Sequence, residues 1–196
     1  MKKFALFAAC ALLTACVAGN AAAEDLRGRI AVTGRIGVID PANSEKNGFE
    51  GTLLVKTDPG IIGGGGFLFG VDENVALDLE VTRSAFDTDG LGRAGVTDLA
   101  VGAQYRLPER QRFVPYAGAG IDVLINDVGN NVTDTVVGLH LKGGVDYMLM
   151  RQVALNAEIK GVEAFNADVR NFAGAKTGEF DPSNVSFTVG ARYFFN

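Results

Sequence analysis

The chain has 196 residues, of which 47% are hydrophobic and 21% charged, and its net charge is −5. This length suits one domain, and the hydrophobic share excludes a disordered protein. Nucleic acid is not an expected partner, because phosphate contacts need clustered Lys and Arg, and the chain is acidic overall.

The first 23 residues have the features of a secretory signal peptide. Lys2 and Lys3 precede an uncharged run, and Ala21-Ala22-Ala23 supplies the small residues that signal peptidase recognises. Cleavage after Ala23 leaves residues 24–196 as the mature protein.

A second interpretation of the leader stays open. Leu13-Thr14-Ala15-Cys16 has the arrangement of a bacterial lipoprotein signal, in which Cys16 would carry the lipid. If cleavage follows Ala23 instead, Cys10 and Cys16 are both removed, and the mature chain has no thiol for a disulfide or a thiolate metal site.

The mature chain lacks the pattern of a membrane-spanning helix. Its longest run without a charged residue is residues 59–71, which is 13 residues, whereas a spanning helix needs about 20. A closed β-barrel is the other structure that crosses a bilayer with all of its backbone groups hydrogen-bonded.

Apolar residues recur at every second position along most of the mature chain. In residues 74–83, for example, Val75, Leu77, Leu79 and Val81 alternate with mostly polar residues. Strand side chains point alternately to opposite faces, so this period predicts strands. The eight predicted strands are residues 27–39, 61–70, 74–83, 97–107, 113–125, 135–147, 153–162 and 183–195.

The connections between the predicted strands alternate in length. A soluble sandwich or lipocalin-like barrel shows the same period of two, so the connections decide between the classes. The long ones are residues 40–60, 84–96, 126–134 and 163–182, and the short ones are residues 71–73, 108–112 and 148–152. Long loops at one end, with short turns and both termini at the other, predict an all-β fold, an eight-stranded antiparallel transmembrane β-barrel.

With the apolar faces turned to lipid, the inward faces carry charges of both signs. They are Arg27, Arg29, Arg35, Arg106, Lys142, Lys160 and Arg192 against Asp78, Glu80, Asp98, Asp122, Asp146 and Glu158. An eight-stranded barrel is only wide enough for its own side chains, so these charges are predicted to pair across the lumen. Inward glycines such as Gly102, Gly120 and Gly144 leave room for the long side chains.

The inward positions near the long-loop end are apolar. Strand directions place Ile39, Ile62, Leu124, Val136 and Val162 there. Two hypotheses follow. These residues form a ligand site for a small hydrophobic molecule that enters from outside and leaves sideways into lipid, or they pack together and anchor the loops.

An enzyme is not predicted. His140 is the only histidine in the sequence, and it faces inward in the middle of a strand. The inward hydroxyl group of Ser186 lies two strands away. A general base needs a nucleophile within hydrogen-bond reach. Asp87-Thr88-Asp89-Gly90 lacks the remaining ligands of a calcium loop. No cofactor or metal is therefore expected.

Several segments resemble the outer-membrane protein W (OmpW) family of small barrels in Gram-negative bacteria. They include Arg35-Ile36-Gly37-Val38, Phe69-Gly70-Val71-Asp72-Glu73-Asn74-Val75, Val114-Pro115-Tyr116-Ala117-Gly118-Ala119-Gly120, Gly144-Val145-Asp146-Tyr147 and Tyr193-Phe194-Phe195. The resemblance implies an eight-stranded barrel in the outer membrane that assists passage of small hydrophobic molecules and serves as a receptor for bacteriocins or phage.

The resemblance also implies the partners. They are outer-membrane lipids, small hydrophobic molecules and the barrel-assembly machinery, which would recognise the C-terminal Phe195. The alternative function is a non-transporting structural, adhesive or receptor barrel that binds partners through its extracellular loops.

Overall fold

The computed structural model describes residues 26–42, 44–48, 51–55, 58–88, 92–107, 112–128, 132–133, 135–165, 167–170 and 176–195. The predicted signal peptide and the Cys16 alternative lie outside these residues. Within them, no helix has the length and hydropathy needed to cross a membrane.

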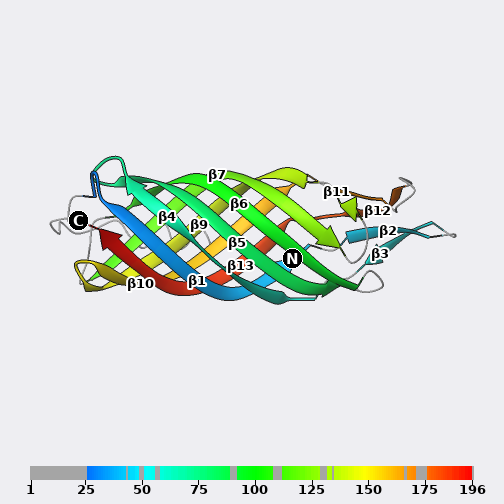
Figure 1. The fold of residues 1–196 in the computed structure, drawn as a ribbon, viewed down its shortest axis with the longest axis horizontal. Helices are drawn as coiled ribbons and strands as arrows, with labels where there is room; N and C mark the ends of the chain where they lie inside the picture. Colours follow the sequence, from blue (N-terminus) through cyan, green and yellow to red (C-terminus); the bar gives the residue numbers. More distant parts are fainter. Residues whose placement is uncertain are drawn as a thin grey trace.

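Eight antiparallel strands close into a barrel. They are β1 (Ile30–Pro41), β4 (Gly60–Gly70), β5 (Val75–Thr88), β6 (Gly92–Arg106), β7 (Phe113–Val128), β9 (Thr135–Met150), β10 (Val153–Ala164) and β13 (Asn184–Phe195). The order around the barrel is β1-β13-β10-β9-β7-β6-β5-β4, and β4 pairs with β1 to close the ring (Figure 1). Each predicted strand corresponds to one of these eight, so the predicted fold class is confirmed.

The two ends of the barrel differ in their connections. At one end, which we call the turn end, β4 is followed by β5, β6 by β7 and β9 by β10. The first and last barrel strands also meet there, since Ile30 pairs with Phe195. The opposite end, the loop end, carries the connections that contain additional strands (Figure 1).

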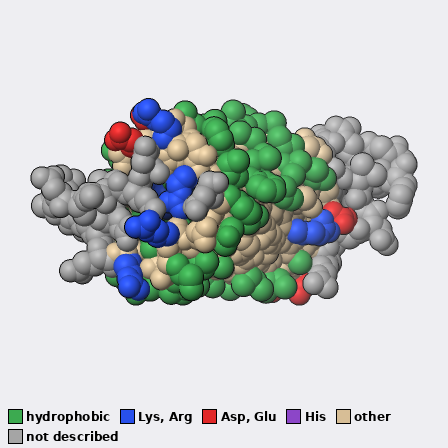
Figure 2. Space-filling view, turned by 60° about the vertical axis from the view of Figure 1, so that its left-hand side comes forward, with side chains coloured by type: hydrophobic (Ala, Val, Ile, Leu, Met, Phe, Trp, Pro, Cys, Tyr) green, Lys and Arg blue, Asp and Glu red, His purple; other side chains and the backbone are tan. Residues whose placement is uncertain are grey.

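Burial follows the period of two along the barrel strands. In β1 the buried positions alternate with exposed ones from Ile30 to Pro41 with little interruption. Large hydrophobic side chains fill the exposed positions, among them Ile36, Leu139 and Leu141, each at least 65% exposed. Figure 2 shows hydrophobic side chains over the middle of the barrel and charged ones toward its two ends. An apolar surface this large is suited to lipid and not to water.

Strands β5 and β6 extend further toward the loop end than the sequence predicted. Residues 84–96 were expected to form a long loop, but β5 and β6 remain paired as far as Thr88 opposite Gly92. The prediction failed because small residues such as Ser84 and Ala94 obscure the apolar alternation, although both are buried.

A second sheet stands beyond the loop end. It consists of β2 (Ser44–Gly48), β3 (Gly51–Val55), β8 (Val132–Thr133), β11 (Ala167–Arg170) and β12 (Lys176–Phe180), in the order β3-β2-β12-β11-β8. Figure 1 shows β2, β3, β11 and β12 extending past the barrel strands. Three connections that the sequence analysis treated as loops therefore join in one sheet, which we call the distal sheet.

Candidate functional site

The lumen is the candidate site, and its middle level is a belt of charged side chains. The buried charged residues of the described chain are Arg35, Arg106, Lys142, Lys160 and Arg192 with Asp78, Glu80, Asp98, Asp122, Asp146 and Glu158. All eleven lie on barrel strands and were predicted to face inward. We call this set, with the polar groups bonded to it, the ion-pair belt.

Most of the belt is one connected network in the part of the lumen that lies nearer the turn end. Its contacts are Lys142 Nζ with Asp78 Oδ2 (2.5 Å) and Glu80 Oε1 (2.9 Å), Arg35 with Glu80 (3.0 Å) and with Glu158, Tyr116 Oη with Glu158 Oε2 (2.7 Å), Asn156 Nδ2 with Tyr116 Oη (2.8 Å) and Asp146 Oδ1 (2.8 Å), and Arg106 and Arg192 with Asp146 Oδ2 (2.6 and 2.5 Å). Tyr116 and Asn156 carry the network between two carboxylates, and the sequence analysis did not identify either as part of it.

A smaller group of belt residues lies nearer the loop end. Lys160 Nζ donates to Asp98 Oδ2 (2.7 Å) and to Asp122 Oδ1 (2.5 Å), and the other oxygen of Asp122 contacts His140 Nδ1 (2.6 Å). Because these groups are buried in a low-dielectric interior, loss of one partner would leave an uncompensated charge. The middle of the lumen is thus filled by mutually paired side chains.

Two residues predicted for the belt lie elsewhere. Arg27 is at the turn end, where its exposed guanidinium pairs with Asp72 (2.5 Å). Arg29 donates to the carbonyl oxygen of Arg151 (2.7 Å) and lies over the Phe194 ring (4.8 Å to the centroid). Both residues precede β1, which begins only at Ile30 after a turn in which Gly28 has a positive φ of 75°.

The apolar residues predicted for the outer lumen come together. Ile39, Ile62, Leu124 and Val162 are 0–8% exposed and belong to one cluster, and Val136 packs against it. The cluster also contains Phe86, Ala94 and Val96, with Ala164 packed against it. We call these nine residues the apolar collar. It lies in the lumen between the belt and the loop end.

Sequence reasoning missed four collar residues: Phe86, Ala94, Val96 and Ala164. They fall in the segments assigned to loops. Continued alternation could have identified Phe86, since Ser84 and Phe86 keep the inward parity of Asp78 and Glu80.

A third level of the lumen was not predicted at all. Leu26, Ala31, Leu68, Ala76, Met148, Ala154 and Phe194 form a buried apolar cluster at the turn end, against which Val114 packs. The lumen therefore has three levels, with the charged belt between two apolar clusters.

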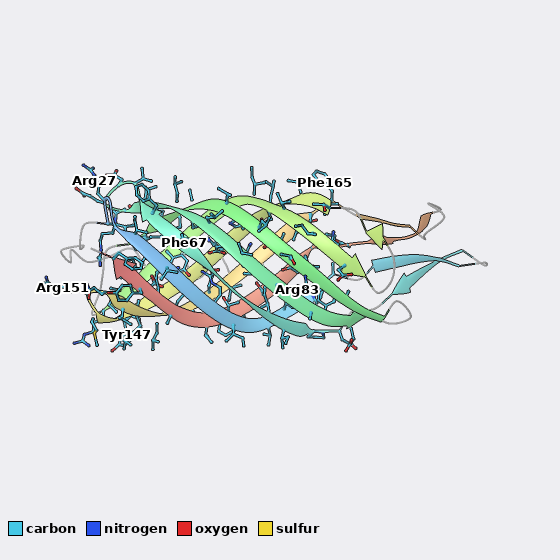
Figure 3. The ribbon with its side chains drawn as sticks, viewed as in Figure 1. Arg27, Phe67, Arg83, Tyr147, Arg151 and Phe165 are labelled. Carbon is cyan, nitrogen blue, oxygen red and sulfur yellow. The ribbon has the colours of Figure 1, made fainter. Side chains whose placement is uncertain are left out.

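Aromatic side chains surround the outside of the turn end. Phe113 and Tyr147 have ring centroids 4.9 Å apart, as do Tyr193 and Phe195. Figure 3 shows Phe67 and Tyr147 pointing away from the barrel on this side. Aromatic residues of this kind mark the interface between acyl chains and headgroups in membrane barrels.

Comparison with known proteins agrees with this arrangement. Residues 7–195 match the family described as outer membrane protein beta-barrel domain. The chain belongs to this family. It is an outer-membrane barrel, and its cellular location is the outer membrane. No curated protein matches the sequence.

Solved structures of small outer-membrane barrels have the same fold. OprG from Pseudomonas aeruginosa is 17% identical, with 88% of this chain and 98% of that chain covered and a TM-score of 0.71. AlkL, solved in DMPC lipid bilayers, is 18% identical, with 91% and 95% covered and a TM-score of 0.59. OmpW from E. coli is 19% identical, with 86% and 98% covered and a TM-score of 0.52. At these identities the likeness establishes the fold.

Glycines give the belt of this outer-membrane barrel its space. A Cβ atom built on Gly120 would lie 2.6 Å from Cε1 of His140, and one built on Gly144 would lie 2.4 Å from Oη of Tyr116. Both distances are too short for a side chain. The His140 and Tyr116 rings therefore lie directly against backbone, as the sequence analysis proposed for the inward glycines.

The only histidine takes part in a structural contact. His140 Nδ1 is bound to Asp122, whereas the Ser186 hydroxyl contacts the carbonyl oxygen of Lys160 (3.5 Å). In the described part of the chain, these two residues do not form a nucleophile and base pair. The chemistry of the lumen is that of ion pairing and apolar contact.

Proposed function

We propose that this outer-membrane barrel assists the passage of small hydrophobic molecules through the outer leaflet. In this proposal a molecule enters from the loop end, occupies the apolar collar transiently and leaves sideways into the membrane. The observation that carries the proposal is the division of the lumen, in which the apolar collar lies directly outside a belt of paired charges.

The belt supports a sideways route. A hydrophobic molecule that moved straight through would have to separate buried ion pairs, such as Arg35 with Glu80 and Lys160 with Asp122. Removing a charge from its buried partner costs about 3–5 kcal/mol, and the belt contains several such pairs. The collar has no such pairs and rearranges at lower cost, because apolar packing is not directional.

The test is uptake of the fluorescent probe N-phenyl-1-naphthylamine into vesicles whose outer leaflet contains lipopolysaccharide. We expect the wild-type barrel to accelerate uptake over empty vesicles and Leu124→Arg to remove the acceleration, since Leu124 is fully buried in the collar. Thr135→Arg is the matched control, because it adds the same charge at an exposed position near the loop end. Equal uptake by wild type and Leu124→Arg would refute the proposal.

The second candidate is a barrel that does not transport and instead presents the distal sheet to partners. The observation in its favour is the tight packing of the collar, whose buried members are at most 8% exposed. If folded wild-type protein fails to accelerate uptake while deletion of the β2–β3 hairpin changes binding of cells or proteins to the surface, this second function is supported.

A further inference from the structure

The exposed charges of the barrel differ in sign between its two ends. At the turn end, the exposed charged residues of the described chain are Arg27, Arg112 and Arg151 with Asp72 and Glu73. Near the loop end, Arg83 is accompanied by the exposed carboxylates of Asp40, Asp58, Asp87, Asp127 and Glu163. Figure 2 shows basic side chains gathered on the turn end, which comes forward in that view. Exposed arginine is therefore concentrated at one end of the barrel.

Two of the turn-end arginines carry a charge that the barrel does not neutralise. The guanidinium group of Arg27 pairs with Asp72. In the part of the chain that the structure describes, the guanidinium groups of Arg112 and Arg151 have no such partner. Both side chains are exposed. We call these two residues the arginine pair, and their positive charges are open to a ligand.

The arginine pair lies at one place on the rim. Arg112 immediately precedes β7, and its carbonyl oxygen accepts a hydrogen bond from the amide of Met148 in the neighbouring strand β9 (2.8 Å). Arg151 directly follows the last residue of β9. Nη2 of Arg29 donates to the carbonyl oxygen of Arg151 (2.7 Å) and holds that turn. Both members of the pair therefore sit where the seam between β7 and β9 reaches the turn end.

Apolar side chains lie directly beside the arginine pair. Phe113 follows Arg112, and its ring centroid is 4.9 Å from that of Tyr147, the residue opposite it on β9. Met150 precedes Arg151 and is 68% exposed. Figure 3 shows Tyr147 and Arg151 at the same end of the barrel. Because aromatic side chains mark the boundary between acyl chains and headgroups, the guanidinium groups beyond them lie at the depth of lipid phosphates.

The backbone of Arg112 is strained in a way that its local fold does not require. Its φ of 74° makes it the only non-glycine residue of the described chain with a positive φ. Glycine adopts this conformation without a steric penalty, as Gly28 does with a φ of 75°. Strained residues of this kind are found at ligand sites, where the side chain is kept for what it binds. The strain therefore points to a role for the guanidinium group of Arg112.

We propose that the arginine pair binds the phosphate group of an anionic phospholipid in the periplasmic leaflet. The short turns of an outer-membrane barrel face the periplasm, and phospholipid forms that leaflet. Guanidinium groups match phosphate with two parallel N–H donors each. The acyl chains of the same lipid continue over Phe113, Tyr147 and Met150. A lipid without a cation in its headgroup is favoured, because a headgroup ammonium would be repelled by the second arginine.

The first experiment compares two lipids on the folded, full-length mature protein. Native mass spectrometry in detergent measures binding of phosphatidylglycerol and of phosphatidylcholine with identical acyl chains. We expect the wild-type protein to bind phosphatidylglycerol about tenfold more tightly, and Arg112→Gln with Arg151→Gln to lose this preference. Arg83→Gln, which removes an exposed charge near the loop end, is the matched control and should keep it. Equal binding of both lipids by the wild type, or a full preference in the double variant, would refute the proposal.

A second variant separates lipid binding from folding. Arg112→Gly removes the charge and relieves the strained φ, so we expect urea unfolding to show no loss of stability while the preference for phosphatidylglycerol falls about threefold. Arg112→Lys retains the charge and should keep most of the preference. If Arg112→Gly folds as the wild type does and keeps the full preference, Arg112 takes no part in the site and the assignment is wrong.

Inorganic phosphate distinguishes a lipid site from a site for a free anion. We expect phosphate at the same concentration as the lipid not to displace phosphatidylglycerol, because the acyl chains add apolar contact with Phe113, Tyr147 and Met150. Displacement at equal concentration would show that the pair takes a free phosphate and would overturn the lipid assignment. The readout is binding at the outer rim, so it does not depend on whether the lumen transports.

Discussion

The ion-pair belt and the apolar collar are adjacent levels of one lumen, built from the same strands with the same inward parity, yet they close it differently. The belt is held by directional contacts, in which Asp146 alone accepts bonds from Arg106, Arg192 and Asn156. The collar is held by packing among residues such as Leu124 and Val162. The difference teaches that directional polar contacts fix each partner in place, whereas apolar packing fills the same lumen without directional bonds, which is why the proposed function assigns the ligand to the collar.

The largest effect should follow removal of the carboxylate on which the lower belt converges. Asp146→Ala leaves the buried guanidinium groups of Arg106 and Arg192 without this partner. We expect the free energy of unfolding to fall by about 3–5 kcal/mol, as for other broken buried ion pairs. Urea unfolding in phospholipid vesicles measures it. Asp72→Ala, which breaks an exposed pair at the turn end, is the control and should have little effect. Equal small losses in both variants would mean that the belt is not the rigid element.

A smaller effect should follow overpacking of the belt. Gly120→Ala places a Cβ atom 2.6 Å from Cε1 of His140 and 2.3 Å from the Val101 carbonyl oxygen. We expect a loss of about 1–3 kcal/mol in the same unfolding measurement. Gly34→Ala is the matched control, because nothing lies within 4 Å of its added Cβ. A belt that tolerated Gly120→Ala as well as the control does would be looser than its contacts indicate.

Trimming the collar should cost less than breaking the belt and should alter permeation. Val162→Ala removes two buried methyl groups, for which we expect a loss of roughly 1.6 kcal/mol at 0.8 kcal/mol per group. Because the collar becomes less tightly packed, the proposed function predicts that uptake of N-phenyl-1-naphthylamine rises. The exposed substitution Val185→Ala, on the outer face of β13, serves as the control for lost hydrophobicity. Slower uptake in Val162→Ala would contradict the assignment of the collar to the route.

The smallest effect concerns the turn end, outside both levels. The hydrogen bond from Arg27 lowers the pKa of the Asp72 carboxyl group below its ordinary value. A lowered pKa in the folded state contributes stability above the unfolded pKa, and this contribution is lost as the pH falls through the folded pKa. We expect the carboxyl ¹³C titration of Asp72 to have a midpoint below about 3.9, and Arg27→Ala to move it upward. An unchanged midpoint in Arg27→Ala would show that the contact does not persist in solution.

The inward and outward faces could be predicted from the sequence because a strand alternates its side chains whatever it pairs with. That period placed Asp78, Glu80 and Lys142 inside and Leu77 and Leu79 outside, and the connection lengths predicted a closed barrel. It also grouped Ile39, Leu124 and Val162 near the loop end, since their heights follow from strand direction alone.

The partners of each charge were decided by the tertiary structure. Which inward residues meet across a lumen depends on the stagger of the strands around the closed barrel, and no local pattern encodes it. The bond between Arg35 and Glu158 and the position of Tyr116 between Glu158 and Asn156 depend on that stagger. The joining of three connections in the distal sheet is likewise a pairing of segments far apart in the sequence. The sequence by itself determined which side chains enter the lumen, because alternation is local. Only closure of the barrel decided which of them touch, because a contact across the lumen joins residues that are far apart in the sequence.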